Sequence, residues 1–307
     1  MGTTYKVKIT APHKIDNVKW VENSIDSILI SFNQQMSTWI EDSEISIFNQ
    51  SLSTDYYKIS DEFYYVLEKG KLISENTDGA FDYTVFPLAN LWGFGPRRED
   101  SLIAPHESKI RKVLQYVGID KISFKYPYIK KSHPKAQIDL NAIAKGYAVD
   151  LVHEWLNNQG YNNIYVEIGG EIRCSGVNKT DQNWIIGIDA PINNPISGQK
   201  IYTTTILENM SLATSGNYRN YLEKNGKKIS HSIDPRNGMP VKTNVLSISV
   251  KARSCLVADA WATALMVLSF DDGLKVIKKV REIEALWILS KDETSISQFS
   301  TRGFFYK

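Results

Sequence analysis

Cysteine is scarce in this sequence, with two copies, Cys174 and Cys255, among 307 residues. Neither belongs to a Cys-x-x-Cys pair, so the pattern does not indicate a zinc or iron–sulfur site. The sequence leaves open whether the two form a disulfide. So few cysteines fit either a cytosolic or an exported protein.

Long apolar runs are also missing, since no stretch approaches the ~20 residues that a membrane helix needs. The sequence has no signal peptide either. It begins Met-Gly-Thr-Thr-Tyr-Lys-Val-Lys-Ile, already inside the alternating pattern of a strand. We expect such a start where a targeting segment has been trimmed from a longer protein.

An excess of one charge is absent, with 36 basic against 34 acidic residues and a net charge of +2. That balance gives no support for nucleic-acid binding. Hydrophobic residues make up 42% and charged residues 23%, which is ordinary for a soluble globular protein. The common nucleotide-binding and hydrolase motifs, such as GxGxxG after a strand, the Walker motif, HExxH and GxSxG, do not occur.

The patterns that are present predict an α+β fold of mostly antiparallel sheets with packed helices, in a single domain over residues 1–307. Apolar periodicity predicts helices over residues 18–36, 61–77, 108–117, 254–269 and 271–280. Alternation predicts strands over residues 3–9, 122–126, 128–130, 201–212, 229–233, 245–250 and 286–290, and several more within 161–191. Residues 37–51 are interpreted as a polar loop. Residues 78–96, rich in aromatics, Gly and Pro, are interpreted as a functional loop.

The segment IDLNAIAKGYAVD, residues 138–150, is a candidate site for an anion. Asp139 is predicted to cap a helix that runs to about residue 157. Backbone N–H groups and the positive end of the helix dipole attract phosphate at such a terminus, and Lys145 adds charge. Gly146 permits a close backbone approach. A plain capped helix with a surface lysine explains the same residues.

The near-apolar helix predicted over residues 254–269 carries Asp259 and Thr263 one turn apart, on one face. A carboxylate and a hydroxyl in such a helix need partners, and a hard cation such as Mg²⁺ would accept both oxygens. Alternatively, Thr263 bonds back to a helix carbonyl and Asp259 caps a neighbouring segment. Taken alone, the pattern slightly favours this second interpretation.

In ISHSIDPRNGMPV, residues 229–241, His231 alternates with two isoleucines and precedes a turn. We expect it on an apolar strand face, and alone this pattern favours a half-buried core histidine. Gly169 and Gly170 interrupt a strand pattern, which indicates a bulge or a close approach of backbone to ligand or protein. The segment LATSGNYRNY, residues 212–221, offers two hydroxyls at Thr214 and Ser215, or simply a strand-to-turn junction.

Together these segments resemble the ApbE family, the FAD:protein FMN transferases. The likeness runs over nearly the whole chain, and the order and spacing of the motifs carry it: Met1-Gly2-Thr3, MSTW (36–39), DGAFDYTVFPLANLWGFGP (78–96), IDLNAIAKGYAVD, VEIGGEIRCSG (166–176), WIIGIDAP (184–191), LATSGNY, ISHSIDPRNGMPV and VADAWATAL. It implies a T-fold-related architecture with FAD in a cleft between two intertwined subdomains.

The resemblance also implies roles for particular residues. Asp259, Thr263 and the backbone carbonyl of Ala142 match the family's metal ligands, and His231 matches its catalytic histidine. Some members carry a second Asp where this chain has Ala262, which leaves the number of metal ions open. The positions where family members contact FAD correspond here to Met1, Trp39, Ala80, Phe81, Asp82, Asp139, Lys145 and Ile233. Some members have Glu in place of Lys145.

The activity implied is a Mg²⁺-dependent transfer of FMN from FAD to a Thr or Ser of a target protein, with release of AMP. Hydrolysis of FAD to FMN and AMP is the alternative, and a non-enzymatic flavin carrier is a third. The implied acceptor motif is Asp-(Gly/Ser)-x-(Ser/Thr)-x-x-Thr, found in membrane respiratory subunits and absent from this chain. The resemblance further implies a periplasmic protein, an inner-membrane lipoprotein at full length, with its membrane contact through a lipid anchor outside this chain.

Overall fold

The computed structural model describes residues 2–11, 17–96, 104–191, 200–217, 221–224, 227–292 and 295–305, with the side chains of 221–229 left out. A sheet of seven antiparallel strands organises the fold, in the order β1-β5-β6-β9-β14-β15-β16. Its strands are β1 (Tyr5–Thr10), β5 (Asn163–Ile168), β6 (Glu171–Ser175), β9 (Ser211–Gly216), β14 (Val245–Ala252), β15 (Glu284–Ser290) and β16 (Ile296–Ser300).

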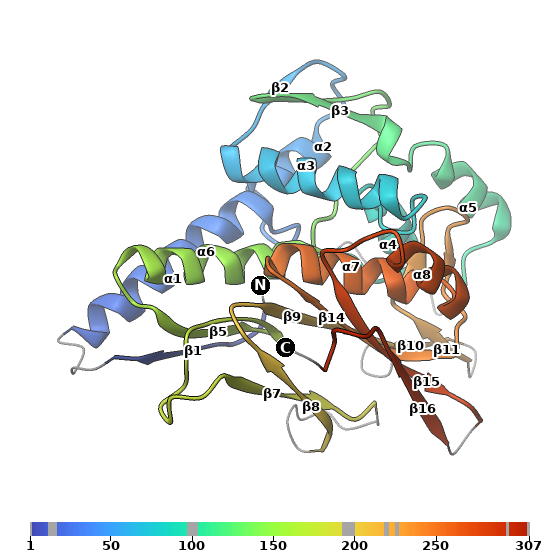
Figure 1. Cartoon of the computed structure of the whole chain (residues 1–307). Helices are drawn as coiled ribbons and strands as arrows, with labels where there is room; N and C mark the ends of the chain where they lie inside the picture. The colour runs from blue at the N-terminus through green and yellow to red at the C-terminus, as the bar shows by residue number, and fades with distance from the viewer. Residues whose placement is uncertain are drawn as a thin grey trace.

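Helices cover one face of this sheet (Figure 1). The helices are α1 (Val18–Met36), α2 (Glu44–Gln50), α3 (Asp61–Asn76), α4 (Phe86–Trp92), α5 (Glu107–Leu114), α6 (Ala144–Asn158), α7 (Cys255–Val267) and α8 (Phe270–Ile277), with a short 3-10 helix at Ile119–Lys121. Helices α6 and α7 lie directly on the sheet, and α3 lies above them. The largest buried apolar cluster fills the space between these layers.

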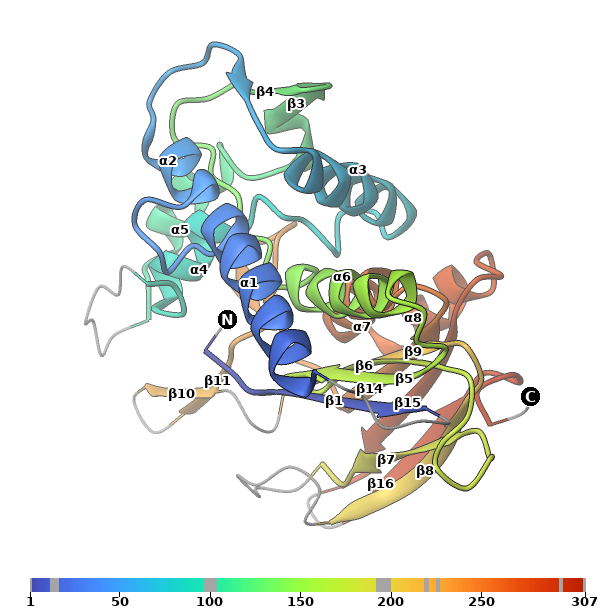
Figure 2. The ribbon, with the colours of Figure 1, turned by 90° about the vertical axis from the view of Figure 1, so that its left-hand side faces the viewer.

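Smaller sheets complete the structure. Strands β2 (Tyr57–Lys58), β4 (Tyr128–Lys131) and β3 (Ile122–Lys125) form a sheet beyond α3, and β7 (Trp184–Asp189) pairs with β8 (Ile201–Leu207). Figure 2 shows the β7–β8 ribbon on the side of the main sheet opposite the helices. The remaining pairs are β10 (Tyr221–Lys224) with β11 (Lys227–Ser230) and β12 (Ile233–Asp234) with β13 (Met239–Pro240).

The predicted α+β class with antiparallel sheets and packed helices is confirmed, since each strand pair among the described residues is antiparallel. None of the described helices is both long enough and apolar enough to span a bilayer. The cysteines, whose pairing the sequence left open, are both free and buried.

Two predicted loops contain helices. Residues 37–51, interpreted as a polar loop, include α2, whose first turn is capped by the Ser43 hydroxyl accepting from the Ser46 amide at 3.2 Å. Ile45 and Phe48 are the buried apolar residues of α2, and a helix of seven residues has too few such positions to show a helical period in the sequence. Residues 78–96 likewise contain α4, which ends at Gly93 with a left-handed φ of 89°.

Candidate active site

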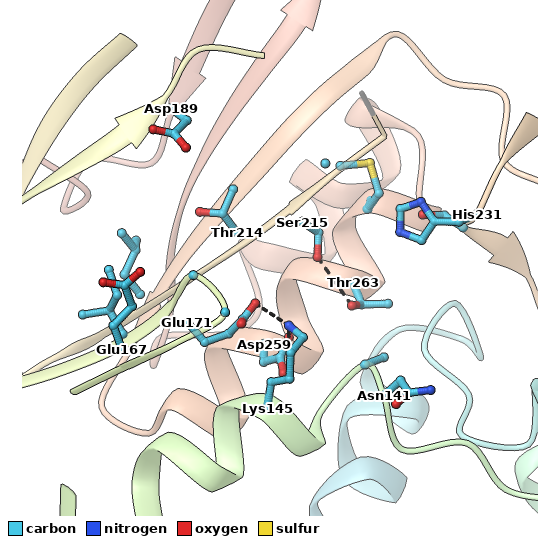
Figure 3. Close-up of a pocket in the computed structure, with 18 of the residues that line it drawn as sticks. Asn141, Lys145, Glu167, Glu171, Asp189, Thr214, Ser215, His231, Asp259 and Thr263 are labelled. Atoms are coloured by element: carbon cyan, nitrogen blue, oxygen red, sulfur yellow. Dashed lines mark hydrogen bonds and ion pairs between the residues drawn. The ribbon is translucent and has the colours of Figure 1, made fainter. Parts of the chain in front are cut away.

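A large cavity, about 1320 Å³, is lined by residues at the start of α6, by Asp259 and Thr263 of α7 and by residues of the central strands β5, β6 and β9. Figure 3 shows the side chains that converge on it from α6, α7, β6 and β9. Eleven of the twelve residues singled out from the sequence line this cavity: Trp39, Ala80, Phe81, Asp82, Asp139, Ala142, Lys145, His231, Ile233, Asp259 and Thr263. Met1, the twelfth, lies outside the described residues.

The junction of α6 and α7 is fixed by Asp150, a carboxylate of α6 that caps α7. Its oxygens accept from the amides of Cys255 and Leu256, both at 2.9 Å, and from the Ser254 hydroxyl at 2.7 Å. Arg173 of β6 donates to the same carboxylate at 2.6 Å. A negative group at a helix N-terminus is stabilised by the helix dipole. These contacts set the register that brings Asp259 of α7 against the first turn of α6.

Gly146 allows the two helices to approach this closely. A Cβ atom at this position would lie 2.3 Å from the Cys255 carbonyl oxygen and 2.8 Å from Asp259 Cβ. The Gly146 amide donates to Asp259 Oδ2 at 2.9 Å, whereas an uninterrupted helix would direct it to the carbonyl of Ala142. The carbonyl of Ala142 therefore lacks the Gly146 amide as its helical partner, and Ala142 lines the cavity, as Asp259 does.

Lys145, Glu171 and Asp259 form a buried charge cluster beside this junction. The Lys145 ammonium lies 2.5 Å from Glu171 Oε1 and 3.8 Å from Asp259 Oδ1. Burial alone would lower the pKa of Lys145, but the two carboxylates raise it overall. Burial raises the pKa of Asp259 and raises that of Glu171 to about 7, against the attraction of the lysine.

Glu171 is a residue of the site that the sequence analysis did not single out. Its side chain is buried, and Oε2 has no hydrogen-bond partner among the described residues. The ion pair draws Lys145 toward Glu171 and away from Asp259, as Figure 3 shows. A charged residue directly after the Gly169–Gly170 turn was the one available signal for it in the sequence.

Thr263 lies one turn beyond Asp259 and also faces the cavity. Its hydroxyl is 3.5 Å from the Ser215 hydroxyl, at the limit of a hydrogen bond. The alternative in which Asp259 caps a neighbouring segment is realised in part, since it accepts the Gly146 amide. Asp259, Thr263 and Ala142 all line the cavity, so its wall offers a carboxylate, a hydroxyl and a backbone carbonyl, which are hard oxygen donors.

His231 does not lie on a strand, which corrects the prediction for residues 229–233. Strand β11 ends at Ser230 and β12 begins at Ile233. The hydroxyls of Ser230 and Ser232 both donate to Asn217 Oδ1, at 2.8 and 3.0 Å, and this bends the chain between the strands. The bend presents the half-buried His231 ring to the cavity, 6.5 Å from the Phe94 ring.

Asp139 does not cap a helix, which corrects a second prediction. Helix α6 begins at Ala144, after a turn over residues 141–143, and upstream of that turn Ile138 is held by both ends of the Asn49 side-chain amide at 2.7 Å. The Asp139 carboxylate accepts from the Asn141 amide at 2.8 Å, and burial raises its pKa. Its own amide donates to the Tyr83 carbonyl, so Asp139 is joined to residues 80–83 of the cavity wall.

The other residues of the predicted FAD site differ in exposure. Ala80, Phe81 and Ile233 are nearly fully buried, whereas the Trp39 side chain is 60% exposed at the rim. Asp82 Oδ1 accepts from the amide and hydroxyl of Thr84, so that carboxylate stiffens the turn before α4. Gly169 and Gly170 form the tight turn between β5 and β6 with left-handed φ of 62° and 104°, conformations that favour glycine.

This fold and cavity place the protein among the flavin transferases of known structure. The flavin transferase ApbE from Vibrio cholerae superimposes with a TM-score of 0.89 at 35% identity, over 99% of this chain and 95% of that one. The apo form of the Pseudomonas stutzeri flavinyl transferase ApbE gives 0.89 at 32% identity, over 99% and 94%. Two relatives named FAD:protein FMN transferase are similar in sequence. The one from Vibrio cholerae is 38% identical over 99% of this chain and 89% of its own length. The one from Haemophilus influenzae is 39% identical over 91% of this chain and 82% of its own length.

The model of the ApbE family matches residues 1–287. The chain therefore belongs to the ApbE family, and the resemblance stated from its motifs is confirmed.

Proposed function

We propose that this protein is a Mg²⁺-dependent FAD:protein FMN transferase. The observation that carries the proposal is that Asp259, Thr263 and His231 line the same cavity as the residues predicted to contact FAD. A flavin carrier would need neither a set of hard oxygen donors nor a histidine beside them. The names of the relatives, which are FAD:protein FMN transferases, point to the same activity.

The residues present fit a magnesium ion. Asp259, Thr263 and the Ala142 carbonyl would hold it, and each supplies the oxygen ligand that Mg²⁺ prefers. Among the described residues no group of three or more His, Cys, Asp or Glu side chains gathers as a metal site. A set of one carboxylate, one hydroxyl and one carbonyl is compatible with that result, because Mg²⁺ usually takes few protein ligands and completes its shell with phosphate and water. When bound, the ion would neutralise charge on the pyrophosphate of FAD.

The chain's own residues would then act as follows. The amino-terminal turn of α6 lies beside Asp259 at the cavity and, together with the Lys145 ammonium, would favour an anionic pyrophosphate. His231 takes the proton from the Thr or Ser hydroxyl of the acceptor as its oxygen bonds to the phosphorus of the FMN half. The bond from that phosphorus to the bridging oxygen breaks, and AMP leaves with this oxygen. The product is FMN joined to the acceptor by a phosphoester.

The test is incubation with FAD, Mg²⁺ and a protein that carries the predicted acceptor motif, followed by in-gel flavin fluorescence. We expect fluorescence on the acceptor, abolished by a chelator or by omission of FAD. Free FMN and AMP with an unlabelled acceptor would instead identify a pyrophosphatase. Intact FAD under all conditions would identify a carrier. The acceptor motif, the periplasmic location and the lipid anchor stay predictions from the resemblance.

A further inference from the structure

The main sheet is covered unequally on its two faces. Helices pack along one face, whereas the β7–β8 ribbon packs on the other (Figures 1 and 2). Trp184, Ile186 and Ile188 of β7 point into a buried cluster with residues of β5, β6, β9 and β15. The margin of the sheet formed by β1 contributes no described residue to this cluster.

This margin is basic and lines the same cavity as the candidate active site. Lys6 and Lys8 of β1 are exposed, lie two residues apart and so share a face of the sheet. Their face is the one opposite the helices, since Tyr5, Val7 and Ile9 pack into the helix-side core. The Lys8 ammonium lies 4.8 Å from the centre of the Tyr165 ring, which in turn lies 5.5 Å from the Trp184 ring of β7.

Strand β7 has one edge that pairs with no other described strand. Among the described strands it pairs with β8 alone. Consecutive residues of β7, including Ile185, Ile186 and Gly187, line the cavity. Because consecutive residues of a strand point to opposite faces, an edge of β7 also borders the cavity. An open edge offers a row of backbone donors and acceptors to another extended chain. Ile185 adds a side chain that is 60% exposed.

The predicted FAD contacts leave this part of the cavity unassigned. They are Met1, Trp39, Ala80, Phe81, Asp82, Asp139, Lys145 and Ile233, and none of them belongs to β1, β5 or β7. A protein-modifying transferase needs room for a segment of its protein substrate beside the flavin nucleotide. The slot between β7 and the lysines of β1 offers backbone pairing on one side and positive charge on the other.

The geometry points to this slot as the docking site of the acceptor protein, which rests on the proposed function. The acceptor inserts an extended segment that pairs with β7 as an added strand and continues the second layer beneath β5 and β1. Acidic side chains at alternate positions of that segment face Lys6 and Lys8. The segment carries its reactive hydroxyl toward His231 at the other end of the cavity.

Amide hydrogen exchange tests the docking site directly. The enzyme is measured alone, with FAD and Mg²⁺, and with an acceptor protein carrying the predicted motif added to both. We expect the amides of residues 184–189 to gain protection when the acceptor is added. Protection caused by FAD alone would assign the slot to the nucleotide, and protection that grows with enzyme concentration would assign it to a second copy; either result overturns the proposal.

Charge reversal provides the second measurement. We expect Lys6→Glu with Lys8→Glu to raise KM for the acceptor roughly tenfold while FAD affinity is unchanged. The matched control is Lys58→Glu with Lys125→Glu, which reverses two exposed lysines on the small sheet beyond α3. An acceptor that is modified with no protection of β7 and no change in KM would refute the docking site and leave the transferase function standing. Absence of any transfer to the acceptor would refute both.

Discussion

At the scale of single residues, the proposed magnesium site depends most on Asp259, because Asp259 is the one carboxylate among its three proposed ligands. Asp259→Asn keeps an oxygen that can accept the Gly146 amide and removes the charge that binds the cation. We expect Mg²⁺-dependent turnover to fall roughly 10²-fold or more, since a catalytic metal supplies several kcal/mol of transition-state stabilisation. Calorimetric titration with Mg²⁺ should show weaker binding, and the melting curve should show an intact fold.

Thr263→Val is the matched variant at the second ligand position. A neutral hydroxyl binds Mg²⁺ less strongly than a carboxylate, so we expect a smaller loss than for Asp259→Asn. Parental activity and Mg²⁺ affinity in Asp259→Asn would remove α7 from the metal site.

His231 is the proposed general base, a role usually worth ~10²–10⁴ in rate. We expect His231→Ala and His231→Asn to lower transfer by about that factor, because neither side chain accepts a proton usefully at neutral pH. FAD affinity and melting temperature should change little, since the ring is half-buried at the cavity and outside the main core. A structural histidine would instead lose stability, with activity following the folded fraction. Normal transfer in a normally folded variant would refute the catalytic role.

At the scale of elements, the contact between α6 and α7 depends on Gly146. In Gly146→Ala the new methyl group would press on the Cys255 carbonyl and on Asp259 Cβ, neither of which can move without shifting a helix. We expect a loss of about 1–3 kcal/mol in the free energy of unfolding, as for an overpacked core, together with weaker Mg²⁺ binding. Urea denaturation and calorimetry measure the two effects.

Asn158→Ala, at the exposed end of the same helix, is the control for Gly146→Ala. It should leave both quantities near the parental values. A Gly146→Ala variant as stable and as Mg²⁺-responsive as its parent would show that the helices do not need this close approach.

The elements also show what sequence patterns can predict. Long amphipathic segments such as α1 and α3 were predicted within a residue, because periodicity over several turns leaves little ambiguity. The short helices α2 and α4 were missed, since one or two turns carry too few apolar positions to define a face. Asp139 and His231 were assigned to the wrong local structure because distant side chains decide it. Asn49 binds the backbone of Ile138, just before Asp139, and Asn217 bends the chain at His231.

The site was predictable to the extent that its motifs are local. Asp259 and Thr263 sit one helical turn apart, so the sequence alone places them on one face. Glu171 was missed because its place in the site depends on Lys145, with which it forms an ion pair, and on Asp259. These two residues lie far from Glu171 in the sequence, on α6 and α7, and the fold brings all three together. Contacts between residues that are far apart in sequence cannot be read from periodicity.

At the scale of the whole molecule, His153 makes stability depend on pH. It is buried between α6 and β6, with Nε2 3.0 Å from the Ser175 hydroxyl and Nδ1 without a partner among the described residues. Burial, with a smaller contribution from Arg173, lowers the pKa of His153 to about 4. The unfolded chain therefore binds this proton at higher pH than the folded protein does, and the associated stability is lost as pH falls from about 6.5 toward 4.

We expect the protonation of His153 to lower the free energy of unfolding of the parent protein by about 2 kcal/mol as the pH falls from 7 to 5. His153→Gln keeps a hydrogen-bonding group that does not titrate, so its curve should fall less steeply over that range. His106→Gln, at the exposed start of α5, should follow the parent. Equal slopes for the parent and His153→Gln in urea denaturation would contradict the assignment.

The proposed function has one direct consequence: for every FMN that moves from FAD onto a protein hydroxyl, one AMP is released. The most direct measurement is stoichiometry: the enzyme is incubated with FAD, Mg²⁺ and an acceptor protein, AMP is quantified by chromatography, and acceptor-bound FMN by intact mass spectrometry. We expect one AMP for each FMN attached, with the modification on a Thr or Ser and no free FMN. AMP formed together with free FMN and an unmodified acceptor would show that the protein is not a transferase.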